Sequence, residues 1–564
     1  QWALRLSNPF IDLLIRFLKS CASNGTVSFL DDLFLCPGMQ TNARTLSQTA
    51  STRSMAVVYG AALVSAWAWA AALGYGVAEL GWVAFLPLWI AWDRTPVTPQ
   101  SVLTHAVGPA LLAHGGAYVG AYPWIVHHAT PSGVQAGLSA LLILTLLYSL
   151  PLMAGGRLAL QGRSGAGLAV WVGGWMLVDL VIQRGSWAFP WVIGAHAVVD
   201  SPGTYTLVRL GGPVALTAVI GCVHGGLLLL VRTFAFRVPV PWPTVRRLGI
   251  PVGIAVLLGG LLLLYGSPAP SSTSLPTAPA TVWAVQPDIS PSTWAEAESA
   301  DRRTQLRALT ETALDTTDTP PDLIVWPETA LHPPDTTGMQ ALVTNWNAPV
   351  LTGAVHPART PATFTNAALL YHPNQPVQQY DKHYLVPFAE TVPGASWWRA
   401  LRRFAMDAPD GRTYVPGQSA TVLSTDAFSF VPLICFESVV SPALSSVQRL
   451  PQARGVITIA QTGWWNRAQP ARQHVQYSRL RAMETGRPLL IASVSGPTTL
   501  VDPSGTATVL APYGDATVIS VRWPAPHPPG LYVRTAPYID IAWTAIALLL
   551  VYASMRWSSL AWSS

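Results

Sequence analysis

The chain has 564 residues, of which 50% are hydrophobic and only 11% are charged, and its formal net charge is +6. Soluble proteins carry about 25% charged residues, so this composition favours a membrane protein with more than one domain. The basic residues are scattered, which argues against nucleic-acid binding. We expect neither a disulfide framework nor a metal site, because the four cysteines lack paired or metal-ligand spacing: Cys21, Cys36, Cys222 and Cys435.

Residues 1–54 differ in composition from the chain that follows. They begin with Gln1, include a short amphipathic run from Phe10 to Leu18, and then become rich in Ser and Thr. We predict a disordered or mis-assigned extension whose native start is Met55. A helix lying on the membrane surface is the alternative.

Apolar segments follow from Met55, each near the roughly 20 residues that span a bilayer, although the second is short. If the first begins inside the cell, Arg94, Arg163 and Arg247 all fall on the cytoplasmic side. The same alternation places the polar domain before the last segment in the periplasm of a bacterial inner-membrane protein. The eight predicted helices are 55–76, 78–92, 103–125, 136–158, 167–183, 204–232, 248–266 and 538–556.

A linker rich in Pro, Ser and Thr, residues 267–280, separates these helices from a domain over about 281–525. In that domain short β-rich runs alternate with helical patterns, which indicates an α/β fold. Residues 526–564 hold the last helix and a tail. The predicted strands are 281–286, 322–327, 350–355, 367–371, 429–435, 455–460, 489–494 and 498–502, with helices near 293–316 and 472–485.

Three strand-like stretches in this domain, 323–328, 380–388 and 431–437, carry the ionisable groups Glu328, Lys382 and Cys435. A carboxylate can take the proton of a thiol, and a lysine can stabilise the thiolate and the oxyanion that forms after its attack. The pattern therefore favours nucleophilic catalysis by Cys435. The alternatives are a buried core cysteine, a helix-capping glutamate and an ordinary solvated lysine.

Glu328 stands in Trp-Pro-Glu, Lys382 in Asp-Lys-x-x-Leu-Val-Pro-Phe and Cys435 in Ile-Cys-Phe-Glu. These three contexts resemble the Glu-Lys-Cys triad of the nitrilase (carbon–nitrogen hydrolase) superfamily. The flanking sequence is similar to the apolipoprotein N-acyltransferases within it. This resemblance runs from about Met55 to the end of the chain. The further matching segments are 286–289 with Trp294, 385–390, 473–474 and 479–488.

The resemblance implies that this domain is a four-layered αββα sandwich. It also implies the activity of a phospholipid:apolipoprotein N-acyltransferase, which requires no cofactor. The acyl donor would be a phospholipid and the acceptor a diacylated apolipoprotein, and we expect a monomer within membrane lipid. By the same resemblance, Glu390 and Glu437 would orient the lysine and the nucleophile, with Trp294 near the substrate. Phe436 stands where tyrosine is more usual, Ala389 where glycine is, and Gln461–Thr462 where Asn-Asp is.

Six aromatic residues are candidates for lipid contact. Trp397 and Trp398 precede arginines at helical spacing, as in an arm lying among lipid headgroups, or in a surface helix packed on the domain. Phe189 and Trp191 resemble a Phe-Pro-Trp motif of the family, and the remaining pair is Trp464 and Trp465. Two other functions stay open: a membrane-tethered amidohydrolase that passes the acyl group to water, and a non-catalytic membrane scaffold.

Overall fold

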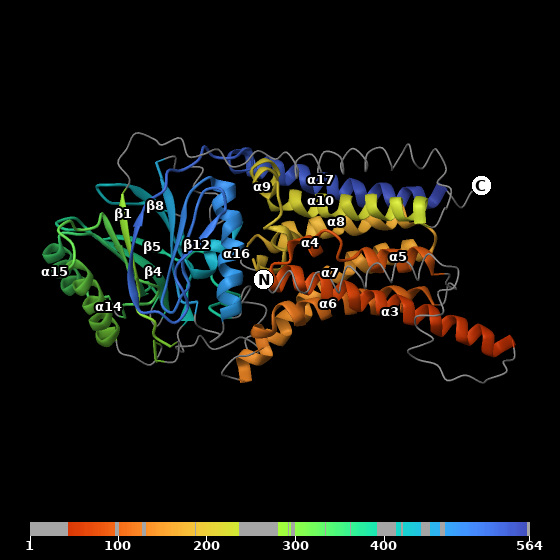
Figure 1. The fold of residues 1–564 in the computed structure, drawn as a ribbon, viewed down its shortest axis with the longest axis horizontal. Coiled ribbons are helices and arrows are strands. Elements are labelled where there is room, and N and C mark those ends of the chain that lie inside the picture. Colours follow the sequence, from red (N-terminus) through yellow and green to blue (C-terminus); the bar gives the residue numbers. More distant parts are fainter. Residues whose placement is uncertain are drawn as a thin grey trace.

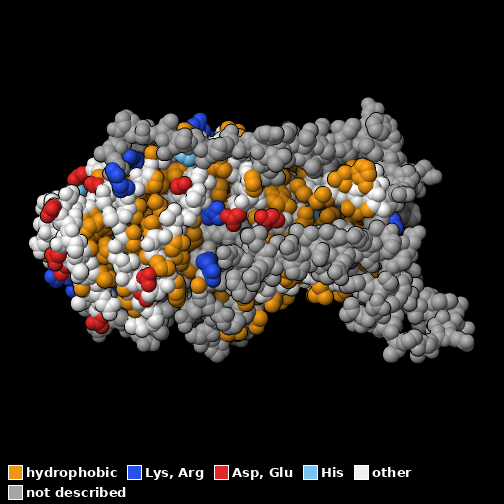
Figure 2. All heavy atoms as spheres, viewed as in Figure 1, with side chains coloured by type: hydrophobic (Ala, Val, Ile, Leu, Met, Phe, Trp, Pro, Cys, Tyr) orange, Lys and Arg blue, Asp and Glu red, His pale blue; other side chains and the backbone are white. Residues whose placement is uncertain are grey.

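A helical bundle and an α/β sandwich lie end to end along the longest axis of the molecule (Figure 1). The computed structural model describes residues 43–95, 101–126, 131–185, 188–235, 280–290, 293–294, 299–332, 334–360, 363–387, 389–391, 413–418, 421–441, 452–462 and 468–560. On the face drawn in Figure 2, acidic side chains lie over the sandwich and its junction with the bundle, and the described surface beyond the junction is mostly hydrophobic.

Helices that come from both ends of the chain form the bundle. Within the described ranges, five stretches are long and apolar enough to cross a membrane: Ser54–Tyr75, Gly137–Leu160, Ser164–Ile182, Pro213–Ala235 and Leu531–Arg556. The α-helices of the bundle are α3 (Ala43–Tyr75), α4 (Ala78–Gly81), α5 (Leu86–Arg94), α6 (Val102–Ala121), α7 (Pro131–Leu160), α8 (Ser164–Ile182), α9 (Thr204–Gly211), α10 (Pro213–Leu230) and α17 (Leu531–Leu560).

Two of the predicted spanning helices are wrong as single helices. The segment 78–92 forms α4 and α5, which a turn over residues 82–85 separates, and Pro87 lies in the first turn of α5. The segment 204–232 breaks at Gly212, whose φ of +73° ends α9, and Pro213 then begins α10. Apolar composition alone cannot distinguish a continuous helix from two helices with a break between them.

Two further predictions concern segments near the limits of the described residues. Helix α3 begins at Ala43, so the predicted extension over residues 1–54 is helical in its last part. The predicted seventh helix, 248–266, and most of the linker 267–280 lie outside the described residues.

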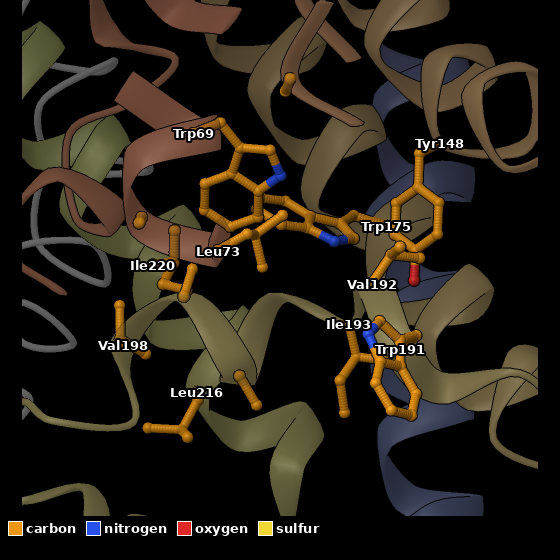
Figure 3. Packing of buried hydrophobic residues seen from close by; sticks show 14 of the residues in the cluster. Trp69, Leu73, Tyr148, Trp175, Trp191, Val192, Ile193, Val198, Leu216 and Ile220 are labelled. Atoms are coloured by element: carbon orange, nitrogen blue, oxygen red, sulfur yellow. The ribbon is translucent and has the colours of Figure 1, made fainter. Parts of the chain in front are cut away.

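Tryptophan rings and close helix contacts fill the interior of the bundle. Figure 3 shows Trp69 of α3 beside Trp175 of α8, and their ring centroids are 5.3 Å apart in an edge-to-face arrangement. Helices α7 and α8 approach so closely that a Cβ on Gly155 would lie 2.6 Å from the carbonyl oxygen of Gly167. Small residues at such crossings allow the van der Waals packing that holds helices together in lipid.

Two mixed sheets face each other in the sandwich. The first follows the order β13-β1-β2-β3-β4-β5, with β6 beside β4, and the second follows β12-β11-β10-β9-β8-β7. The strands are β1 (Thr281–Gln286), β2 (Leu323–Val325), β3 (Val350–Pro357), β4 (Thr363–Tyr371), β5 (Gln378–Asp381), β6 (Thr413–Tyr414), β7 (Leu423–Ser424), β8 (Ser429–Ile434), β9 (Gly455–Ala460), β10 (Leu489–Ser493), β11 (Thr498–Val501), β12 (Ala507–Ala511) and β13 (Thr517–Arg522).

Alternating side chains of the strands bind the layers together. In β1, Val282 and Ala284 pack between the sheets, whereas Trp283 and Val285 pack beneath α14 (Ser299–Leu314) and α15 (Thr336–Trp346). Helix α16 (Ala468–Thr485) covers the outer face of the second sheet and lies between it and the bundle (Figure 1). This is the αββα layer order that the resemblance implies.

Every strand predicted for the sandwich is present, with ends that differ by at most four residues. The sequence analysis missed α15, β5, β6, β7, β12 and β13. Strand β13 pairs antiparallel with β1 across most of the domain, with Arg522 opposite Thr281.

Candidate active site

The sandwich brings Glu328, Lys382, Glu390 and Cys435 together. Glu328 follows β2, Lys382 follows β5 and Cys435 follows β8. The Lys382 Nζ lies 2.8 Å from Glu390 Oε1 and 3.9 Å from Glu328 Oε1. Cys435 is near enough to Glu328 and Lys382 for both charges to shift the pKa of its thiol. The sequence prediction that these groups share one site therefore agrees with the geometry.

Buried donors hold the Glu328 carboxylate in place. Its Oε1 accepts a 2.8 Å hydrogen bond from Asn366 Nδ2, and its Oε2 accepts one of 2.8 Å from the backbone N–H of Gln461. Burial raises the pKa of Glu328, and the charge of Lys382 acts in the opposite direction. Gly353 gives this segment room, because a Cβ there would lie 2.5 Å from Glu328 Cα. Glu328 is thus a buried carboxyl with a raised pKa, suited to proton transfer.

Lys382 is a buried cation between two carboxylates, with only 1% of its side chain exposed. Burial by itself lowers the pKa of Lys382, but Glu390 and Glu328 outweigh that effect and leave its pKa raised. Glu390 is fixed in turn by the backbone N–H of Val386, which donates to Oε2 at 2.8 Å. The ammonium group is therefore a fixed positive charge beside Cys435.

Cys435 opens a short 3₁₀ helix, Cys435–Val439, with a φ of +49°. This left-handed conformation is uncommon for a residue with a side chain and turns the strand sharply at the cysteine. Burial raises the pKa of the Cys435 thiol, the charge of Glu328 raises it further, and Lys382 lowers it. The thiol is therefore protonated at rest, and it needs a base to become a nucleophile.

Glu437 ties the lysine loop to the cysteine turn. Its Oε1 accepts hydrogen bonds from Tyr380 Oη at 2.7 Å and from the backbone N–H groups of His383 and Tyr384 at 2.8 and 3.0 Å. Its Oε2 accepts from the N–H of Ile434 at 2.9 Å. One buried carboxylate thus joins the residues on both sides of Lys382 to the residue before Cys435. This arrangement fits the orienting role that the resemblance implies for Glu437.

Trp294 contacts the residue that follows Glu328. It is buried under α14, and its indole N–H donates to Thr329 Oγ1 at 3.0 Å, on the residue after Glu328. Its backbone carbonyl accepts a 2.7 Å hydrogen bond from Arg302. Trp294 is therefore placed to support the turn that carries Glu328.

Aromatic side chains from the bundle stack beside the nucleophile. The Phe436 ring lies nearly parallel to Trp191, with centroids 6.4 Å apart, and to Phe189, with centroids 6.1 Å apart. Trp191 comes from a 3₁₀ turn that follows α8, and Figure 3 shows it beside Val192 and Ile193. The other four lipid-contact candidates, Trp397, Trp398, Trp464 and Trp465, lie outside the described residues.

Sequence reasoning gave no role to two residues that hold the site. Asn366 on β4 donates to Glu328, and His474 on α16 contacts the carbonyl oxygen of Cys435 at 3.0 Å. His474 lies in a segment that carried the family resemblance, but no local pattern points it at the cysteine. Among the residues that the structure describes, no cluster of His, Cys, Asp and Glu side chains could hold a metal ion.

Comparison with known proteins agrees with these observations. Residues 278–524 match the carbon–nitrogen hydrolase family. The apolipoprotein N-acyltransferase of Geobacter metallireducens is 26% identical over 449 residues, which cover 76% of this chain and 81% of that protein. The one from Ralstonia nicotianae is 30% identical over 363 residues, 61% of this chain and 64% of that protein. This chain is a homologue of the apolipoprotein N-acyltransferases.

A crystal structure of an amidase from Nesterenkonia is 15% identical, covers 45% of this chain and 94% of its own, and superposes with a TM-score of 0.33. Glu328, Lys382 and Cys435 all lie within the carbon–nitrogen hydrolase domain. Phe189 and Trp191 come from the bundle that precedes it.

Proposed function

We propose that this chain is an N-acyltransferase that moves a fatty acyl chain from a phospholipid to the α-amino group of the diacylglyceryl-cysteine of lipoproteins. The names of its homologues support this activity. The observation that carries the proposal is the aromatic contact at the nucleophile. Phe436, next to Cys435, stacks on Phe189 and Trp191 from the bundle, so the cysteine turn lies against the apolar part of the chain, as an enzyme with lipid substrates would require.

In the first half-reaction Glu328 takes the thiol proton as Cys435 Sγ attacks the sn-1 ester carbonyl of the phospholipid. Lys382 and backbone N–H groups stabilise the tetrahedral oxyanion. The ester C–O bond then breaks, Glu328 returns the proton to the leaving oxygen, and lysophospholipid departs. A thioester between Cys435 and the acyl chain remains.

In the second half-reaction the free amine of the diacylglyceryl-cysteine attacks the thioester carbonyl. Glu328 accepts a proton from the attacking nitrogen, the C–S bond breaks, and the Cys435 thiolate regains a proton. The sequence is a ping-pong reaction on one Glu-Lys-Cys triad, with Glu390 and Glu437 as orienting groups.

We also propose that the protein is a monomer in the bacterial inner membrane, with eight membrane segments, of which the second is divided into α4 and α5, and with the sandwich facing the periplasm. Five described helices long and apolar enough to cross a membrane support membrane insertion. The distribution of arginines supports the orientation.

The test is intact-mass spectrometry of the full-length protein incubated with phospholipid and no acceptor. We expect a mass increase of one fatty acyl group that hydroxylamine removes, in the wild type and in Cys222→Ala but not in Cys435→Ala. Addition of a diacylglyceryl-cysteine peptide should then transfer the acyl group to its amine. Release of free fatty acid instead would identify a hydrolase. Absence of any acyl adduct in the wild type would reject phospholipid as the donor.

A further inference from the structure

The backbone at Cys435 needs restraint on both sides to keep its left-handed φ of +49°. On the amino side, the N–H of Ile434 donates to Glu437. On the carboxyl side, two groups converge on the carbonyl oxygen of Cys435: Ser438 Oγ at 3.0 Å and His474 Nε2 at 3.0 Å. The second of these comes from another element, α16, and therefore fixes the cysteine turn relative to the rest of the domain.

The protonation state of His474 follows from its partners. His474 Nε2 lies 3.0 Å from the carbonyl oxygen of Cys435 and 2.8 Å from Ser438 Oγ, whose hydroxyl donates to the same carbonyl oxygen. Because both oxygens can then accept from it, Nε2 is assigned the proton. Burial lowers the pKa of His474 to about 4, which keeps the ring neutral near pH 7. Its Nδ1 has no hydrogen-bond partner among the described residues. The single N–H of His474 therefore points at the cysteine turn, between the carbonyl oxygen of Cys435 and Ser438 Oγ.

The residues around His474 on α16 are fixed to the membrane helices. Gln473 Nε2 donates to the carbonyl oxygen of Ala121 at 2.9 Å, and Gln473 Oε1 accepts from Trp124 Nε1 at 2.7 Å. Tyr477 Oη lies 3.0 Å from Tyr122 Oη, which donates to the carbonyl oxygen of Trp191.

The His474 ring itself lies nearly parallel to Trp191, with centroids 6.2 Å apart. Gln473 and Tyr477 of α16 thus contact the helical bundle, and His474 of the same helix contacts the backbone at Cys435.

We propose that His474 is a positioning residue that sets the Cys435 turn and links it to the membrane helices. It touches neither substrate nor the sulfur in this role, and it acts through the backbone carbonyl of Cys435. Its importance for acyl transfer rests on the function proposed above. Without its N–H, the turn relaxes and Sγ moves away from Lys382 and from the backbone N–H of Gln461, the two groups that lower the pKa of the thiol.

The experiment compares three variants of the full-length protein in detergent micelles. His474→Gln keeps an N–H donor at similar reach, and His474→Phe keeps a ring that can stack on Trp191 but has no donor. Met483→Leu, a buried change of similar size on the same helix, is the matched control. The rate of iodoacetamide alkylation is followed on the peptide that contains Cys435 from pH 6 to pH 10, beside the rate of acylation by phospholipid and thermal unfolding.

We expect alkylation of His474→Phe to be at least tenfold slower at pH 8, with its whole pH–rate profile displaced toward higher pH and acylation slowed in parallel. His474→Gln should stay within threefold of the wild type, as should Met483→Leu. The proposal is overturned if a folded His474→Phe keeps the wild-type rate and pH profile, or if a folded His474→Gln is slowed as much as His474→Phe.

If His474→Phe shows no cooperative unfolding, His474→Leu replaces it under the same criteria. Alkylation does not depend on any lipid substrate. A wild type that alkylates as described but forms no acyl adduct would therefore reject the proposed function and leave the role of His474 standing.

Discussion

Replacement of Glu437 by glutamine tests whether one carboxylate holds the two halves of the site together. The side chain is fully buried and accepts four hydrogen bonds, three at Oε1 and one at Oε2. Glutamine offers one acceptor oxygen and one NH₂ group. If the oxygen faces the three donors around Lys382, the NH₂ group faces the N–H of Ile434, and two donors then oppose each other.

The magnitude follows from these four bonds. A buried donor without a partner costs about 1–3 kcal/mol, and each of the three remaining bonds weakens by about 1 kcal/mol when its acceptor loses the charge. Burial also disfavours the charged form of Glu437 and raises its pKa, so glutamine recovers part of this loss. We expect a net loss of about 2–4 kcal/mol in the free energy of unfolding, or roughly 5–15 °C in Tm.

Thermal unfolding and Cys435 acylation by intact mass measure this prediction on the same sample. Acylation should slow more than tenfold, because the loop that carries Lys382 is no longer fixed to the cysteine turn. The control is Glu311→Gln, which makes the same chemical change in an exposed ion pair with Arg307 and should alter stability by about 0–1 kcal/mol. A Glu437→Gln protein with unchanged Tm and an acylation rate within twofold of the wild type would refute the reasoning.

Two further changes test the packing and the titration of the site. Gly353→Ala places a Cβ 2.5 Å from Glu328 Cα, so the rate of acylation should fall more than tenfold and Tm should also fall. The control Gly60→Ala, whose added Cβ has no atom within 4 Å, should leave the rate and Tm unchanged. Because the folded pKa of His474, about 4, is below its unfolded value near 6.5, its stabilising contribution is present above pH 6.5 and is lost as pH falls toward 4. Between pH 6.5 and pH 4 the wild type should therefore lose about 3 kcal/mol more of its free energy of unfolding than His474→Gln loses. Denaturant unfolding at each pH measures both losses, and equal losses would contradict a folded pKa of about 4 for His474.

The elements that were predicted best are those whose own residues carry a clear apolar pattern. Strand β9 was predicted at its observed ends, 455–460, because a fully buried strand is a continuous apolar run. Glu328 and Cys435 were found because each follows an apolar, buried strand, β2 or β8. Strand β5, which precedes Lys382, is polar and partly exposed, so Lys382 was found through the resemblance of its sequence context. The aromatic pair Phe189 and Trp191 was found through family resemblance alone.

What the sequence did not predict depends on contacts between distant segments. Strand β13 is half exposed along most of its length, and its pairing with β1 leaves no periodic signal. The break at Gly212 lies between two apolar segments that read as one helix. Asn366 and His474 are polar residues inside regular elements, and only the folded arrangement shows that they contact Glu328 and Cys435.

The packing of α17 on α8 has a consequence for the time course of synthesis. At Gly173 of α8, a Cβ would lie 2.7 Å from the carbonyl oxygen of Ala547 on α17, so this contact requires the bare glycine backbone. About 350 residues separate the end of α8 from the start of α17, and at 5–20 residues per second a ribosome needs roughly 20–70 s to make them. During that interval the glycine face of α8 has no α17 to cover it. A nascent chain that stalls within the sandwich would therefore present this face to lipid or to the machinery that removes unfinished membrane proteins.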